Sequence, residues 1–173
     1  MKLKNILHPV IIIVLAAGLR LIPHPANVAP IAAMALFGGA YLGKKNALLI
    51  PLIALFVSDL FLGLHRTMPF VYGSFLLTGL CGMWLKGHKT FQNVLLITLL
   101  SSTQFFIITN LGVWLVGSLY PKTLSGLLLC YTYAIPFFRN TLLGDLLYTG
   151  VFFGGYEVVT NFLPKKLYDK NLH

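Results

Sequence analysis

Charge is scarce in this 173-residue chain: 10% of the residues are charged and only 4 residues are Asp or Glu, whereas 57% are hydrophobic. A soluble domain of this size needs more charge to wet its surface. The composition therefore excludes an ordinary soluble protein and indicates one integral membrane domain. The net charge of +9 would suggest nucleic acid in a soluble protein. Here membrane topology explains it better, so no nucleic-acid partner is expected.

Motifs for common catalytic and metal chemistry are also missing. The sequence holds no GxSxG, no Walker motif and no HExxH. Cys81 and Cys130 lie in different apolar runs without metal or redox spacing, and no two histidines have ligand spacing. We therefore predict no catalytic residue, no metal and no cofactor, and we expect that the chain is not an enzyme.

Long apolar runs take the place of charge. A membrane span needs roughly 17–25 predominantly apolar residues. Five runs meet or approach this length, and a sixth, about 29–43, is shorter; together they predict an all-α integral membrane protein with six transmembrane helices in a single domain over 1–173. The runs are 5–22, 29–43, 47–64, 69–86, 91–118 and 136–157, followed by a cytoplasmic tail at 158–173. Segment 123–135 is too short to span alone, and we interpret it as a short re-entrant or interfacial helix.

The basic residues give the expected orientation. With six spans and the N-terminus inside, one side of the membrane carries Lys2, Lys4, Lys44, Lys45, Lys86, Lys89, Lys165, Lys166 and Lys170. The opposite side keeps Arg20, Arg66 and Lys122. The positive-inside rule then sets both termini in the cytoplasm, an N-in/C-in arrangement.

Ionisable residues inside the spans mark a candidate site. Such groups are expensive in hydrocarbon and are kept only where they face protein, water or a ligand. Asp59 and Arg139 fall at comparable depth in the predicted outer half. We expect that they could pair, either as a structural ion pair or as part of a ligand site. One acidic and one basic group at similar depth suit a zwitterionic or hydrogen-bonding molecule.

Asp145 belongs to a polar stripe on the last span. Thr141, Tyr148 and Thr149 lie three or four residues from it, on the same helical face. We interpret this stripe as a contact between helices in preference to a proton relay. On the fifth span, Asn110 and Trp114 share a face, which suits either a flat polar ligand or a lipid-belt Trp beside a packed Asn.

Together these observations predict an outward-facing pocket with a set of ligand-binding residues: Asn27, Asp59, Asn110, Trp114, Arg139, Asn140 and Asp145. The short outer connections add His24, His65 and Arg66. A third set, Ala35, Gly39 and Gly43, recurs every fourth residue, which lets another helix approach closely. That helix belongs either to the same bundle or to a separate membrane subunit.

Several stretches resemble a known family. They are PHPANVAPIAAMALFGGAYLGKK, LLIPLIALFVSDLFLGLH, FFIITNLGVWL and YPKTLSGLLLCYTYAIPFFRNTLLGDLLYTG. Over about residues 21–154 the chain resembles a family of small bacterial membrane proteins without an assigned role. That family is grouped with the substrate-binding (S) components of energy-coupling factor (ECF) transporters.

The resemblance implies a multi-pass protein of the bacterial cytoplasmic membrane with six helices. It also implies an outward-facing pocket for a vitamin or similar micronutrient, and docking to a transmembrane coupling subunit driven by two ATPase subunits. In S components the small docking residues lie on the first helix, whereas the clearest stripe here lies on the second. Two other functions stay open. One is a stand-alone small-molecule carrier or channel. The other is a membrane-embedded enzyme acting on a lipid-like substrate through Asp59, Asp145 or His24.

Overall fold

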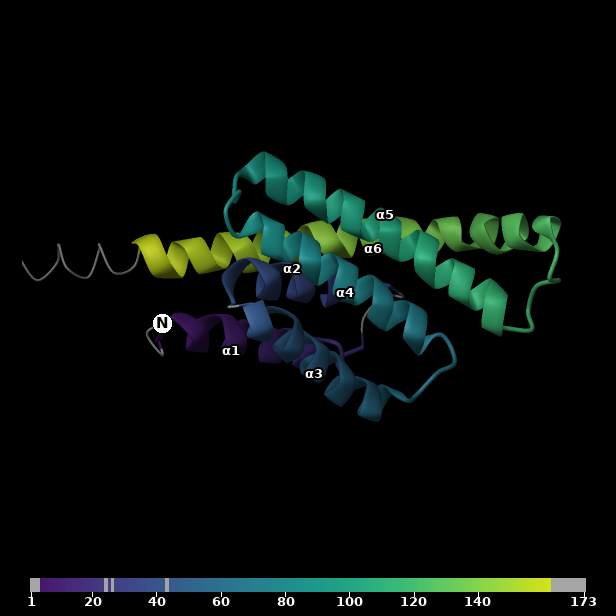
Figure 1. The fold of residues 1–173 in the computed structure, drawn as a ribbon, viewed down its shortest axis with the longest axis horizontal. Coiled ribbons are helices and arrows are strands. Elements are labelled where there is room, and N and C mark those ends of the chain that lie inside the picture. The colour runs from purple at the N-terminus through teal and green to yellow at the C-terminus, as the bar shows by residue number, and fades with distance from the viewer. Residues whose placement is uncertain (1–3, 24, 26, 43, 163–173) are drawn as a thin grey trace, which may run out of the picture.

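The protein is a bundle of helices that run back and forth between two ends (Figure 1). The computed structural model describes residues 4–162 except 24, 26 and 43, and these residues form six α-helices and no strand. The helices are α1 (Lys4–Leu19), α2 (Ile31–Tyr41), α3 (Lys44–Leu62), α4 (Met68–Leu85), α5 (Phe91–Val116) and α6 (Leu124–Glu157), followed by a π-helical turn, η1 (Val158–Phe162). The all-helical prediction is confirmed for the described part of the chain.

Three helices are long and apolar enough to cross a membrane. They cover Lys45–Leu62, Met68–Leu85 and Phe91–Val116 within the described residues. Two shorter apolar helical segments cover Pro9–Leu19 and Ile31–Tyr41. At about 1.5 Å per residue, three such helices match a hydrocarbon core of about 30 Å. The chain therefore has the character of a membrane protein.

Helix α6 corrects one expectation. Residues 124–135 are not a separate re-entrant or interfacial helix, because they form the first part of α6 and continue into it without a break. Thr123 caps the start of the helix, its hydroxyl accepting from the Gly126 amide at 3.2 Å. Pro136 lies inside the helix rather than at its start. A proline inside an apolar helix is tolerated where neighbouring groups satisfy the freed carbonyl, so Pro136 does not mark a boundary.

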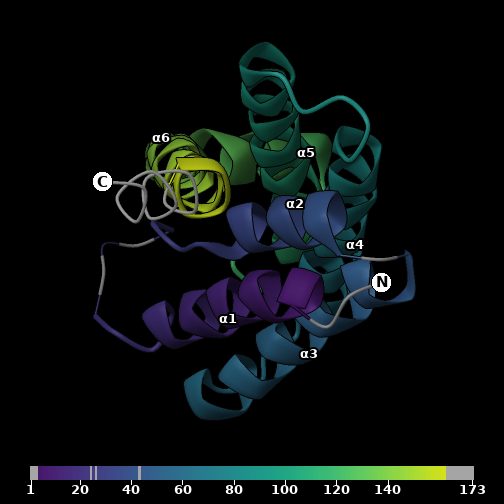
Figure 2. The ribbon, with the colours of Figure 1, turned by 90° about the vertical axis from the view of Figure 1, so that its left-hand side faces the viewer.

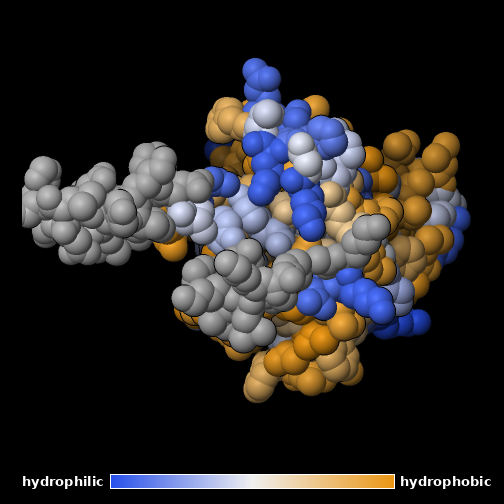
Figure 3. Space-filling view, turned by 60° about the vertical axis from the view of Figure 1, so that its left-hand side comes forward, coloured by the Kyte–Doolittle hydropathy of each residue, from blue (hydrophilic) through white to orange (hydrophobic). Residues whose placement is uncertain are grey.

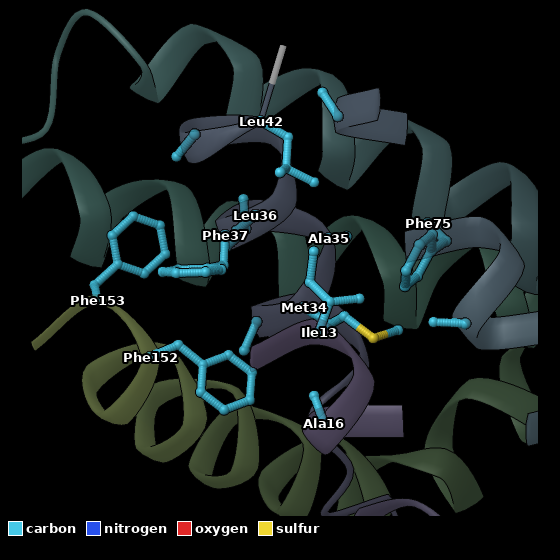
Figure 4. Close-up of a cluster of buried hydrophobic side chains, with 14 of the residues drawn as sticks. Ile13, Ala16, Met34, Ala35, Leu36, Phe37, Leu42, Phe75, Phe152 and Phe153 are labelled. Carbon is cyan, nitrogen blue, oxygen red and sulfur yellow. The ribbon is translucent and has the colours of Figure 1, made fainter. Parts of the chain in front are cut away.

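Helix α2 is the centre of the bundle. It packs against α1, α3, α4, α5 and α6, and Figure 2 shows it enclosed by its neighbours. Nine consecutive residues, 32–40, are buried. A helix that is apolar all round has no face for water and must be buried. Phe37 packs edge-on against Phe152 and Phe153 of α6, as Figure 4 shows for the buried cluster.

The small residues of α2 serve this packing. Ala35 and Gly39 are buried within the bundle, where a methyl group added at Gly39 would collide with the backbone of Gly79 and Gly82 on α4. The two helices approach so closely because these positions lack side chains. Of the two alternatives expected for this stripe, packing within the bundle is the one that Ala35 and Gly39 make, because both are buried among neighbouring helices. Gly43 lies outside the described residues.

The flanks of the bundle are apolar. Leu60, Phe61, Leu96 and Leu147 are each more than half exposed, on α3, α5 and α6. Figure 3 shows hydrophobic residues along the sides of the molecule and hydrophilic residues gathered toward the end that comes forward in that view. Soluble monomers rarely expose so much contiguous apolar surface, so these flanks suit contact with lipid.

Candidate functional site

Asp59 on α3 is the best-satisfied charged group of the bundle. Its carboxylate is 2% exposed, and Oδ1 lies 2.8 Å from the Arg20 guanidinium. Tyr72 of α4 donates its hydroxyl to Oδ2 at 2.8 Å. Arg20 also donates to the Ser58 hydroxyl. The group therefore joins the end of α1 to α3 and α4.

This arrangement corrects the expected pairing of Asp59 with Arg139. Helix α3 packs against α1, α2 and α4, whereas α6 packs against α2 and α5. Equal depth therefore does not bring Asp59 and Arg139 together, because their helices do not adjoin. Arg139 is exposed on α6. Arg20, which follows α1 directly, takes the place beside Asp59.

Beside Arg20 lies the larger of two adjoining cavities, which we call the Asn27 cavity. Its volume is about 320 Å³, near the lower end of the range for small-molecule sites. It lies between the α1–α2 connection, the start of α2, the end of α3, and α5 and α6. The residues that line it are Arg20, Asn27, Ala29, Ile31, Ala32, Leu62, Phe105, Thr141 and Asp145.

The smaller cavity continues the first toward the α5–α6 connection. It has a volume of about 140 Å³, and we call it the Asn110 cavity. Its lining shares Asn27, Phe105 and Thr141 with the Asn27 cavity and adds Phe106, Thr109, Asn110, Ala134 and Phe137. The pair of cavities thus offers a guanidinium, a carboxyl, two amides and aromatic rings around one space. This is the mixture of apolar wall and few polar groups that holds a small ligand.

The connection from α1 to α2 covers this space. Asn27 has φ of 64°, a left-handed backbone that asparagine tolerates better than most residues. Val28 lies against Gly144, where an added Cβ would be 3.1 Å from the Val28 Cα. The absence of a side chain at Gly144 therefore lets this connection pack closely on α6, next to Asp145.

Asp145 has a different environment from Asp59. It is 3% exposed, and its Oδ2 accepts a hydrogen bond of 2.6 Å from the Ser102 hydroxyl of α5. Its carboxyl contributes to the wall of the Asn27 cavity. The contact joins α5 to α6 as the predicted polar stripe implies, and it also borders a space that a ligand can enter.

The other predicted residues have separate places. Trp114 donates its indole N–H to the Pro121 carbonyl at 2.8 Å, and Lys122 donates to the Trp114 carbonyl, so Trp114 closes the α5–α6 connection. Asn110 donates to the Phe106 carbonyl at 2.8 Å while lining its cavity. Asn140 is half-buried on α6 and lines neither cavity.

The loop residues stand apart from both cavities. His65 Nδ1 is 2.8 Å from the Thr67 hydroxyl, and both His65 and Arg66 are exposed in the α3–α4 connection. His24 lies outside the described residues. Within the part of the chain that the structure describes, no group of three His, Cys, Asp or Glu side chains could hold a metal ion.

Sequence reasoning missed Arg20, Ser102 and Phe105 as site residues. A signal for Arg20 was present, because it lies near the end of the first apolar run and a long arginine stem can reach back along a helix end. Ser102 and Phe105 carried no signal, since the face of α5 that meets α6 is decided by packing. Asn27, Asn110 and Asp145 were predicted as ligand-binding residues, and they line the two adjoining cavities.

Together these features describe an all-helical protein of membrane character with two adjoining cavities, each lined by apolar and polar residues, toward one end of the bundle. The chain belongs to a family described as "Family of unknown function (DUF6580)", whose model matches residues 2–166. No curated protein and no solved structure matches the chain.

Proposed function

We propose that this protein is the substrate-binding membrane subunit of an uptake system of the ECF type. In this proposal the Asn27 and Asn110 cavities hold a small polar or aromatic micronutrient. The observation that carries the proposal is the convergence of Arg20, Asn27, Asn110 and Asp145 on one adjoining space beneath a close-packed connection. A guanidinium and a carboxyl on the same wall suit a ligand with both donors and acceptors.

The proposal includes a topology of six spans in the bacterial cytoplasmic membrane with both termini inside. It is supported by the alternation of the helix connections between two ends (Figure 1). Lys45, Lys86 and Lys89 lie at one end, and Arg20 and Lys122 at the other. Short loops with more Lys and Arg are retained in the cytoplasm, which puts the Asn27 cavity on the outside.

Helix α2 has its own part in this topology. Its 11 residues give about 16 Å of helix, which is too short for a hydrocarbon core of about 30 Å. Irregular backbone at membrane depth is tolerated where protein covers it or where it lines a cavity. The connection that precedes α2 meets the second condition, because Asn27 and Ala29 line the Asn27 cavity.

The transporter class is tested by purifying the tagged protein from its own cell in mild detergent and identifying co-purified proteins by mass spectrometry. A membrane coupling subunit and two ATPases are the expected partners. Clean isolation without any ATPase, repeated in more than one detergent, would overturn the ECF assignment.

The cavity is tested separately by binding. A panel of water-soluble vitamins would be screened for stabilisation of the purified protein against heat. Asn27→Gly removes the amide and keeps the left-handed backbone, and Thr141→Val removes the hydroxyl at nearly constant volume. Each should weaken the binding of a hit by about fivefold or more, the effect of one lost hydrogen bond. Thr103→Val, on an exposed face of α5, is the matched control and should bind normally. Unchanged affinity in both cavity variants would refute the site.

A further inference from the structure

Another cavity, separate from the Asn27 and Asn110 cavities, lies toward the other end of the α5–α6 pair. It has a volume of about 490 Å³, and we call it the Lys89 groove. Its polar lining comes from Tyr41, Lys89, Thr98, Thr149 and Glu157, and its apolar lining from α5 and α6. At the mouth, Tyr41 donates to Glu157 at 3.0 Å, and the Lys89 ammonium sits 4.0 Å from the Tyr41 ring centre. The groove is therefore polar at its rim and apolar along its walls.

The Asn27 cavity and the Lys89 groove reach nearly the same level of α6 from opposite ends of the bundle. Thr141 and Asp145 line the Asn27 cavity, and Thr149 lines the Lys89 groove. These three residues follow at intervals of four, so they share one face of the helix. From Asp145 to Thr149 the helix rises by about 6 Å, or roughly one turn. About one turn of α6, from Asp145 to Thr149, and about two turns of α5, from Thr98 to Phe105, therefore separate the two spaces.

Polar side chains of α5 and α6 lie between the two spaces. On α5, Thr98 lines the groove and Ser102 donates to Asp145, and both are buried. On α6, Thr149 is 3% exposed, and its hydroxyl has no hydrogen-bond partner among the residues that the structure describes. A buried hydroxyl that only holds two helices together is normally paired, because an unpaired one costs desolvation free energy. An unpaired hydroxyl at the end of the groove indicates a place for water or a passing proton.

Asp145 is suited to the chemistry of such a place. Asp59 is held by a guanidinium and a tyrosine, whereas the hydrogen bond described for Asp145 comes from one serine. A carboxyl without a cation on it can gain and lose a proton without breaking an ion pair. Carboxylic acids inside membrane segments commonly mark proton paths for this reason.

Few other charges face Asp145. Arg20 shares the Asn27 cavity and is paired with Asp59. Helix α5 contains no titratable side chain, and the one on α2 is Tyr41, at the mouth of the groove. On α6 itself the nearest is Tyr148, which is half-buried. The proton state of Asp145 thus depends mainly on the two spaces on either side of it.

We propose that Asp145 passes protons between the Asn27 cavity and the Lys89 groove. A hydronium ion in the cavity gives its proton to the carboxylate. The carboxylic acid then gives a proton, through the Ser102 and Thr149 hydroxyls, to water in the groove. One O–H bond forms and one breaks at Asp145, so the carboxylate is regenerated and one proton has crossed. This activity goes beyond ligand binding, and it gives the protein a way to respond to the proton gradient.

The test measures proton flux in vesicles of phosphatidylcholine and phosphatidylglycerol that contain the purified full-length chain and a pH-sensitive dye. A potassium gradient with valinomycin supplies the driving potential. The wild-type protein should acidify the lumen faster than protein-free vesicles. Asp145→Asn, which cannot carry a proton, should return the rate to that of protein-free vesicles. Asp145→Glu should restore flux, because a carboxyl is present again.

Two hydroxyl variants keep the test decisive if Asp145→Asn fails to fold. Thr149→Val should slow the flux by about fivefold, the loss expected for one hydrogen bond. Thr103→Val is the matched control, since that hydroxyl is exposed on another face of α5, and it should conduct like the wild type. Wild-type flux no faster than protein-free vesicles, or full flux in Thr149→Val or Asp145→Asn, would overturn the proposal. Ligand binding at the Asn27 cavity is measured independently, so either proposal can fail alone.

Discussion

The Arg20–Asp59 pair gives the sharpest prediction about stability. Arg20→Met removes the guanidinium and keeps most of the side-chain length, leaving a carboxylate that is 2% exposed without its cation. Breaking one partner of a buried ion pair costs about 3–5 kcal/mol. Tyr72 still donates to the carboxylate, so the lower end of this range is expected. A loss of about 3 kcal/mol in a chain of this size lowers Tm by about 6–12 °C.

The reverse change should cost less. Asp59→Leu leaves Arg20 unpaired, but its side chain is 11% exposed and retains some contact with solvent. The double variant Arg20→Met with Asp59→Leu removes both charges. Apolar replacement of a whole buried pair is often neutral or stabilising. Here the Tyr72 hydroxyl loses its acceptor, which leaves a net loss of about 1–3 kcal/mol.

The assay is thermal unfolding of the purified variants in one detergent at one scan rate, followed by tryptophan fluorescence. Equal scan rates matter because unfolding of such proteins is commonly irreversible. The double variant should be more stable than Arg20→Met plus Asp59→Leu taken additively, with a coupling of about 2 kcal/mol or more. Additive losses, or an Arg20→Met variant within about 2 °C of wild type, would refute the ion-pair argument.

Two further predictions concern the packing and the cavities. Gly39→Leu should lower the free energy of unfolding by about 1–3 kcal/mol, because it overpacks α2 against the backbone of α4. Gly73→Ala, with open space around it, should be neutral or slightly stabilising. Thermal unfolding compares the two variants, and equal Tm values would contradict the close approach of α2 to α4. Two cysteine variants in a background without native cysteines test which side of the membrane each cavity faces. Thr141→Cys should react with a membrane-impermeant thiol reagent added from one side of a sealed membrane, and Thr149→Cys only with reagent added from the other side. Labelling of both from the same side would contradict the two-cavity arrangement.

Much of the helical framework could be predicted from the apolar runs. The predicted run 69–86 and α4 differ by one residue at each end, and the predicted run 91–118 contains α5. Long apolar segments between basic or proline-containing turns have little alternative to a helix in a membrane. The break expected between 123–135 and the last span was wrong, because a segment too short to span alone is here the first part of one long helix that continues through Pro136.

The lateral arrangement of the helices could not be predicted in the same way. Depth along a span follows from counting residues, but which helices adjoin depends on side-chain packing of the whole bundle. The sequence therefore placed Asp59 and Arg139 at one level and could not show that α3 and α6 do not adjoin. The small-residue stripe of α2 was recognised, but only packing decides whether its partner is α4 or a second subunit.

The two buried aspartates show how environment separates structure from function in one bundle. Asp59 is paired with a cation and hydrogen-bonded to a tyrosine, so its replacement should act first on stability. Asp145 has the Ser102 hydroxyl on one oxygen, borders the Asn27 cavity, and lies about one helical turn from the Lys89 groove. A site that only joined α5 to α6 could use Asn or Thr without the cost of a buried carboxyl. A carboxyl between two cavities is what the proposed proton transfer requires at this place.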